Sequence, residues 1–178
     1  MKLLIAPHND DETLFAAYTI QREKPLVAVV LDCYLQGLRG ARITAQERRD
    51  ETAAALRILG ADVVFLGFHD DSPDWDGIER SLREYHPDAV WAPAVEPGGH
   101  AHHNAIGAIA HRIWPDRTRH YMTYTPAGKS RGIPVPKRPE WIAAKLRALA
   151  CYVSQIEDLS TQEHYLRDQY EYYAPPQI

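Results

Sequence analysis

Cysteine is scarce in this sequence: only Cys33 and Cys151 occur among its 178 residues. Two cysteines cannot build the disulfide framework of a small secreted protein, and neither lies in a Cys-x-x-Cys pair. Long apolar runs are also missing, because no stretch approaches the roughly 18 to 20 apolar residues that a membrane-spanning helix needs. The beginning, MKLLIAPHND, lacks the long apolar segment of a signal peptide. We therefore expect a cytoplasmic protein with no membrane span, in which both thiols are buried and unreactive.

The sequence also has no large excess of positive or negative charge. The formal net charge is −4 and is spread without blocks, so nothing favours nucleic acid or an anionic membrane as a partner. The substrate is expected to be a small molecule. A chain of this length suits one domain with a full core, and residues 1–178 are expected to form a single domain. The sequence makes no prediction about the oligomeric state.

What the sequence does contain is an alternation of short apolar runs with segments of helical period, the pattern of a parallel sheet covered by helices. The expected fold is α/β, a Rossmann-like three-layer α/β/α sandwich with a mostly parallel sheet. The expected strands are Lys2–Ala6, Leu26–Leu31, Asp62–Leu66, Ala89–Ala92 and His120–Tyr124. The expected helices are Asp10–Gln21, Thr44–Leu59, Asp76–Tyr85, Ala101–Ile113, Glu140–Ile156 and Thr161–Tyr170. A Pro-rich surface loop is expected over Thr125–Pro139.

Two polar segments follow expected strands, PHNDDE at 7–12 and GGHAHHN at 98–104. Since ligands of a parallel sheet bind beyond the carboxyl ends of its strands, both segments are expected at the same edge. Imidazole and carboxylate groups together suit Zn²⁺ or another first-row divalent ion. The expected ligands are His8, Asp11 and one histidine of the second segment. Asp10 would then accept a proton from a water that the metal activates, which predicts a hydrolase.

Each segment also has a simpler explanation. An Asn-Asp pair after a strand commonly caps a helix, and Asp10, Asp11 and Glu12 suit the positive end of a helix dipole. The histidine-rich segment alone is also typical of a polar loop. The metal interpretation depends on the two segments occurring together in one α/β domain.

These segments resemble the motifs of the PIG-L/LmbE-like family of metal-dependent de-N-acetylases, which carry (A/P)-H-P-D-D-E after the first strand and a later H-x-D-H. Further similarities follow in the family's order over nearly the whole chain: Arg48-Arg49-Asp50-Glu51 with Leu59-Gly60, Phe65 to Asp70, and Lys145 to Gln155. The resemblance implies a deacetylase domain with this fold. It implies a metal, normally zinc, and removal of an N-acetyl group from an amino sugar, such as N-acetylglucosamine, or a similar small amide.

Carried onto this sequence, the resemblance implies His8, Asp11 and His103 as metal ligands and Asp10 as general base. It implies His100 as the group that stabilises the tetrahedral intermediate or protonates the leaving amine. Arg48 and Asp70 are implied as contacts to the substrate.

Two positions depart from the family pattern. Asn9 replaces a proline, which removes no chemical group and is expected to be harmless. His102 replaces the aspartate between the two later histidines, so His102 could assist or replace His103 or His100. The alternatives to a deacetylase are therefore a non-catalytic or altered metal-binding member, or a metal hydrolase that cleaves a different small-molecule amide bond.

Overall fold

Five parallel strands run through the middle of the computed structural model, which describes residues 1–32, 43–124, 132–155 and 171–174. The sheet has the spatial order β3-β2-β1-β4-β5-β7-β6, and only β6 and β7 run antiparallel to their neighbours. The strands are β1 (Lys2–Ala6), β2 (Leu26–Asp32), β3 (Val63–His69), β4 (Ala89–Pro93), β5 (Thr118–Tyr121), β6 (Ile133–Pro134) and β7 (Tyr172–Tyr173).

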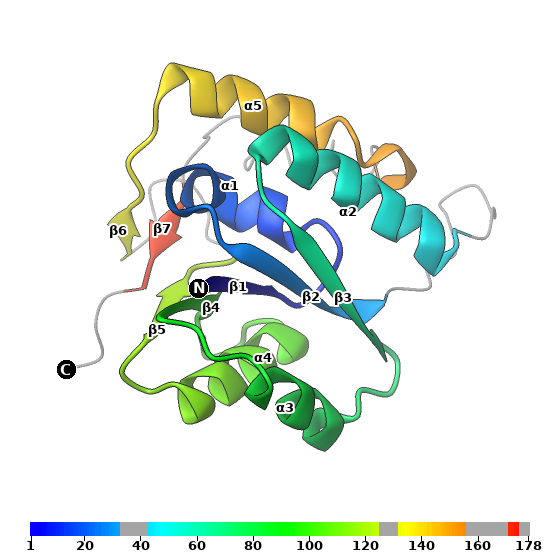
Figure 1. Ribbon diagram of the computed structural model, residues 1–178, viewed down its shortest axis with the longest axis vertical. Helices are drawn as coiled ribbons and strands as arrows, with labels where there is room; N and C mark the ends of the chain where they lie inside the picture. Colours follow the sequence, from blue (N-terminus) through cyan, green and yellow to red (C-terminus); the bar gives the residue numbers. More distant parts are fainter. Residues whose placement is uncertain (33–42, 125–131, 156–170, 175–178) are drawn as a thin grey trace.

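Helices cover both faces of this sheet (Figure 1). One layer holds α1 (Asp11–Glu23), α2 (Ala45–Leu59) and α5 (Pro139–Leu149), and the other holds α3 (Trp75–Arg83) and α4 (Ala101–Ile113). Alternate residues of β1 enter different cores: Leu4 packs with the α1 side and Leu3 with the α3 and α4 side. The expected three-layer α/β/α sandwich with a mostly parallel sheet is confirmed.

Local sequence sets the helix boundaries, as α2 shows. The Thr44 side chain accepts from the Glu47 backbone N–H while the Glu47 carboxylate accepts from the Thr44 backbone N–H, and Gly60 ends the helix at φ 75°. Only a residue without Cβ takes this left-handed conformation at low cost. Helix α4 begins and ends at the expected residues.

Two expected elements are displaced. Strand β5 covers Thr118–Tyr121 rather than His120–Tyr124, because the polar residue Arg119 pairs with Trp91 and lays its guanidinium over the indole ring. The helix expected over Glu140–Ile156 ends at Leu149 and is followed by a short 3₁₀ turn. This break turns Tyr152 into the core.

Some other expectations differ from the structure, and some concern residues that it does not describe. The two-residue strands β6 and β7 were not predicted, and β6 lies in the second half of the expected Pro-rich loop. Cys151 is partly exposed rather than buried. The first half of that loop, the helix expected over Thr161–Tyr170 and Cys33 lie outside the described residues. None of the described helices is long and apolar enough to cross a bilayer.

A buried ion pair ties Glu171, the residue directly before β7, to α1 and α5. Lys145 of α5 lies 2.8 Å from Glu171 and also donates to the Leu14 carbonyl at 2.7 Å, while Glu171 accepts the Tyr18 backbone N–H at 2.9 Å. Both charged residues are 2% exposed. Burial raises the pKa of Glu171 in spite of the Lys145 ammonium. Each charge therefore depends on the other for compensation.

Lys145→Met is expected to lower the free energy of unfolding by about 3–5 kcal/mol, because it leaves Glu171 buried without its cation. Adding Glu171→Gln should recover much of this loss. The matched control is Lys2→Met, which breaks an exposed pair with Glu23 and should cost less than about 1 kcal/mol. Urea unfolding measures all three, and equal losses in the two lysine variants would contradict the role assigned to Lys145.

Candidate metal centre

The order of the strands creates the site. Strand β1 lies between β2 and β4, so the connection after β1 leads to one side and the connection after β4 to the other. Loops that leave neighbouring strands in opposite directions open a crevice at the carboxyl edge of the sheet. His8 to Asp11 follow β1, and His100 to His103 follow β4. The two segments therefore meet although more than eighty residues separate them in sequence.

Asp10 occupies a strained position at the start of α1. Its φ of 106° and ψ of −27° are unusual for a residue with a side chain. Its backbone N–H donates to Glu12 Oε2 at 3.1 Å and its carboxylate accepts from Arg48 at 2.8 Å. The Asp10 side chain makes no capping hydrogen bond to α1. The simple helix-cap explanation is therefore wrong for this side chain, although its carbonyl accepts from Thr13 and Leu14.

Three donor atoms form a nearly equilateral triangle at the bottom of the crevice. His8 Nδ1 lies 3.1 Å from Asp11 Oδ2, His103 Nε2 lies 3.2 Å from the same oxygen, and the two nitrogens are 3.3 Å apart. A tetrahedral zinc ion with bonds of about 2.0–2.1 Å separates its donor atoms by about 3.3 Å. The triangle therefore fits one face of such a coordination shell.

Hydrogen bonds behind the triangle orient its members. His103 is 1% exposed, and its Nδ1 lies 3.1 Å from Thr123 Oγ1. When Nδ1 carries the proton, it donates to Thr123 and leaves the Nε2 lone pair directed at the triangle. The backbone N–H of His8 donates to Asp11 Oδ2 at 2.8 Å. Burial alone would raise the pKa of Asp11, but His103 and His8 outweigh it and hold that pKa far below its usual range.

The side of the triangle that the protein leaves open faces a cavity of about 250 Å³. Every residue that the resemblance implied, apart from the deeply buried His103, contributes to its wall. The lining residues are His8, Asn9, Asp10, Asp11, Arg48, Asp70, His100, His102, Tyr124 and Gln155. A catalytic zinc commonly has three protein ligands and one open position, which this arrangement provides.

His100 and His102 lie at the mouth of the cavity but outside the triangle. His100 precedes α4 and is exposed, with its ring centroid 4.8 Å from that of His103. Desolvation, followed by the neighbouring histidines, lowers the pKa of His100 to about 4. His102 Nδ1 lies 2.9 Å from His8 Nε2, the nitrogen that points away from Asp11. His103, rather than His102, is thus the histidine in the triangle with Asp11.

Arg48 and Asp70 take different positions in the wall. The Arg48 guanidinium is buried and bound to protein groups, with Asp10 at 2.8 Å and Glu51 at 3.0 Å. This geometry makes it a positioning contact for Asp10, and its implied contact with substrate stays a prediction. The Asp70 Oδ1 atom is buried and has no hydrogen-bond partner among the described residues.

Sequence reasoning missed several residues that support the site. Thr123 carries no motif, and its contact with His103 follows only from the path of the chain after β5. Glu12 is fully buried and accepts from Thr13 at 2.8 Å and from the Tyr152 hydroxyl. Asn9, expected to be harmless, is fully buried and donates to Thr52 at 3.1 Å, which joins the β1 loop to α2.

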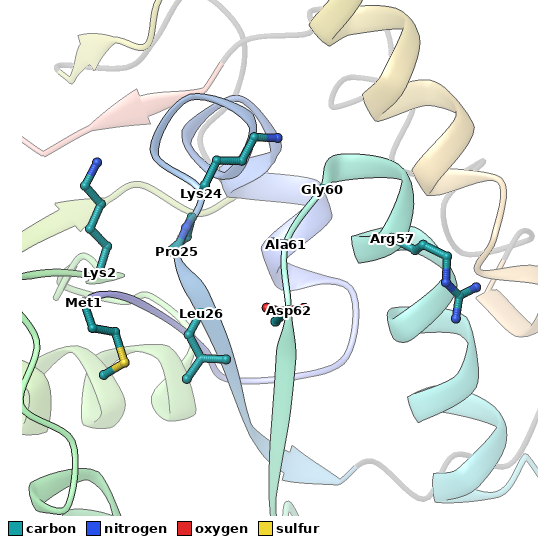
Figure 2. A pocket seen from close by; sticks show the side chains of 9 residues that line it. All are labelled: Met1, Lys2, Lys24, Pro25, Leu26, Arg57, Gly60, Ala61 and Asp62. Carbon is teal, nitrogen blue, oxygen red and sulfur yellow. The ribbon is translucent and has the colours of Figure 1, made fainter.

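A larger pocket of about 660 Å³ lies at the opposite edge of the sheet, where β1, β2 and β3 begin (Figure 2). Its basic side chains do not converge: Lys2 and Arg57 stand on opposite sides and point apart. Lys2 is paired with Glu23, and Lys24 donates to the Leu59 carbonyl. This edge carries the amino ends of the strands, so we place the chemistry at the crevice.

The sequence model of the GlcNAc-PI de-N-acetylase family, PIG-L, matches residues 3–114, which include both polar segments. No curated protein sequence gives a significant match.

Three solved structures illustrate the shared fold. A deacetylase of the teicoplanin biosynthetic pathway, in a triple-mutant form, has a TM-score of 0.74 at 20% identity, covering 93% of this chain and 86% of its own. The A40926 pseudoaglycone deacetylase Dbv21 has a TM-score of 0.72 at 20% identity, covering 89% and 84%. GalB, the 4-carboxy-2-hydroxymuconate hydratase of Pseudomonas putida KT2440, has a TM-score of 0.70 at 19% identity, covering 100% and 98%.

Thr123→Val is expected to weaken zinc binding by about 10- to 100-fold, because it removes the oxygen that orients His103 and keeps the side-chain shape. Competition with a chromophoric chelator measures the dissociation constant. The control is Thr19→Val, which removes a hydroxyl that contacts Tyr173 and should leave zinc affinity unchanged. Equal affinities in wild type and Thr123→Val would show that Thr123 does not support the site.

Proposed function

Because the chain belongs to the PIG-L family of GlcNAc-PI de-N-acetylases, a membership that supports a hydrolytic deacetylase, we propose that it removes an N-acetyl group from a small molecule. The proposed substrate is an N-acetylated amino sugar such as an N-acetylglucosamine derivative. The proposed metal is zinc or another first-row divalent ion. We also propose that the protein is cytoplasmic.

The triangle of His8 Nδ1, Asp11 Oδ2 and His103 Nε2 is the observation that carries this proposal. It supports these three residues as the metal ligands, since its edges fit a tetrahedral ion and its open side meets the cavity. When bound, such an ion supplies Lewis-acid polarisation of a carbonyl and lowers the pKa of adjacent water. Side chains of the protein would carry out the remaining steps, which are proton transfer and stabilisation of the oxyanion.

Asp10 is the proposed general base. It is next in sequence to the ligand Asp11, yet its own carboxylate is directed to the cavity and bound to Arg48. Burial raises the pKa of Asp10 to about 6, against the opposing effect of Arg48. A carboxylate with this pKa is ionised at neutral pH and can still hold a proton taken from the attacking water. The proton can then pass to the departing amine.

His100 is proposed to stabilise the oxyanion of the tetrahedral intermediate. Because its pKa is lowered to about 4, its imidazole is neutral at neutral pH and can donate a ring N–H without carrying charge. The lowered pKa makes His100 a poor proton reservoir, so Asp10 is the better source of the proton for the amine. The exposed position of His100 at the cavity mouth suits contact with the reacting carbonyl.

The substrate proposal follows from the family and from the site. The family model describes enzymes that act on an N-acetylglucosamine linked to phosphatidylinositol, and one structural neighbour is a deacetylase in complex with teicoplanin. The family's name supports an amide carried on a sugar, and the neighbour supports deacetylation. Arg48 and Asp70 of the cavity wall are the proposed contacts to the substrate's polar groups.

Acetate release from N-acetylglucosamine derivatives should be abolished by a chelator and restored by zinc. Asp10→Asn should lower kcat/KM by about 10²–10⁴-fold, because it removes the proton acceptor while leaving the three ligands. The control is Asp50→Asn, which changes an exposed carboxylate on α2 and should retain full activity. Turnover that survives the chelator or the Asp10→Asn change would sink the proposed mechanism.

The pH profile gives a second test. Asp10 must be ionised to accept a proton, so kcat/KM should fall as the pH drops through the pKa of Asp10. That pKa is about 6 without a metal ion. A metal ion bound by His8, Asp11 and His103 would lower it further, because its positive charge stabilises the carboxylate. Arg48→Met removes a cation that stabilises the Asp10 carboxylate, which raises the pKa of Asp10. The acid limb should therefore move to higher pH. A limb that stays in place in a folded Arg48→Met variant would contradict Asp10 as the titrating base.

A further inference from the structure

The imidazoles of His100 and His102 lie close to that of His8, and His102 contacts the His8 nitrogen that points away from Asp11. His8 Nε2 lies 2.9 Å from His102 Nδ1. The ring centroids of His8, His100 and His102 form a triangle with sides of 5.2, 5.2 and 5.1 Å. One donor nitrogen from each ring lies within 4.8 Å of the other two.

We propose that His8, His100 and His102 form a second metal site, beside the first and sharing His8, which takes Zn²⁺ or a similar late first-row divalent ion. Three imidazoles favour zinc, copper or nickel over magnesium and calcium, which prefer oxygen ligands. Three protein ligands again leave a position open to solvent.

The surroundings of these rings suit a cation. His100 is exposed and His8 and His102 are partly exposed, so an ion can enter from the cavity that all three line. Asp70 lines the same cavity, and its buried Oδ1 has no hydrogen-bond partner among the described residues. A cation next to this carboxylate would supply the missing compensation.

A simple hydrogen bond between His8 and His102 also gives a 2.9 Å contact. Such a bond would involve neither the ring of His100, which lies 5.1 Å from that of His102, nor the Asp70 carboxylate. The metal site accounts for all of these groups together. It also uses a departure from the family motif described above, in which an aspartate stands at the position of His102.

Filling both sites changes His8 and His100. His8 becomes a bridge that binds one ion through Nδ1 and the other through Nε2, and its Nε2 proton leaves to solvent. His100 becomes a ligand and can no longer assist the reaction. Excess zinc is therefore expected to inhibit deacetylation, a consequence that rests on the proposed function, whereas binding of the second ion does not.

The test is the number of zinc ions bound by the metal-free full-length protein, measured by equilibrium dialysis at buffered free zinc. Wild type should bind two, one tightly and one more weakly, and magnesium should not replace the weaker one. His102→Gln keeps an acceptor for the His8 N–H but has no imidazole, and it should bind only the tight ion. His100→Gln should also bind only the tight ion, and it provides the test if His102→Gln fails to fold. His86→Ala, which removes an exposed histidine elsewhere, should still bind two.

Anomalous diffraction at the zinc edge should then show a second peak between His8, His100 and His102. One bound zinc in wild type, or two in folded His102→Gln and His100→Gln variants, would overturn the second site. A protein that binds two zinc ions but never releases acetate would refute the proposed function and leave the second site standing. A protein that releases acetate but binds only one zinc ion would refute the second site and leave the proposed function standing.

Discussion

One carboxylate oxygen, Asp11 Oδ2, organises the whole site. It accepts the His8 backbone N–H at 2.8 Å and faces the ring nitrogens of His8 and His103 at 3.1 and 3.2 Å. Asp11 is 1% exposed, so its charge must be compensated within the protein. In the proposed site, a cation shared with two neutral imidazoles would compensate it. Without one, the same field favours a proton on His8: the effect of burial is outweighed by Asp11, so that the pKa of His8 is raised. Protons and the proposed metal would therefore compete for this part of the site.

A second network keeps the neighbouring Asp10 apart from that oxygen. Its positive φ turns the side chain out of the helix, and Arg48 and Glu12 hold both ends of the residue. Burial raises the pKa of Glu12 to about 7, although Tyr152 and Thr13 donate to its carboxylate. Two adjacent aspartates thus acquire opposite pKa shifts, with Asp11 lowered and Asp10 raised. Such a division lets one bind a cation while the other exchanges a proton.

The sequence predicted those parts of the structure that local chemistry determines. The β1 to β4 positions and α4 followed from apolar period, and α2 from its Thr44 and Glu47 capping box. Contacts set by tertiary packing escaped prediction. The start of β5 was not predicted because the charged residue Arg119 interrupts the apolar pattern, and its guanidinium is accommodated over the Trp91 ring. Strands β6 and β7 were not predicted because two residues are too few to show a period. Within the site, residue types pointed to His8, Asp10 and Asp11, but only the chain path could place Thr123 behind His103 and His102 beside His8.

The fold by itself does not select the reaction, since deacetylases and a hydratase share it at about 20% identity. Both chemistries need an activated water, which the proposed metal in the crevice between β1 and β4 would provide. Amide hydrolysis additionally needs a donor for the developing oxyanion and a proton for the amine. In this chain a neutral His100 at the cavity mouth suits the first task and Asp10 the second. Because His102 approaches the same imidazoles, this single position links the arrangement of the proposed catalytic groups to the proposed number of metal ions.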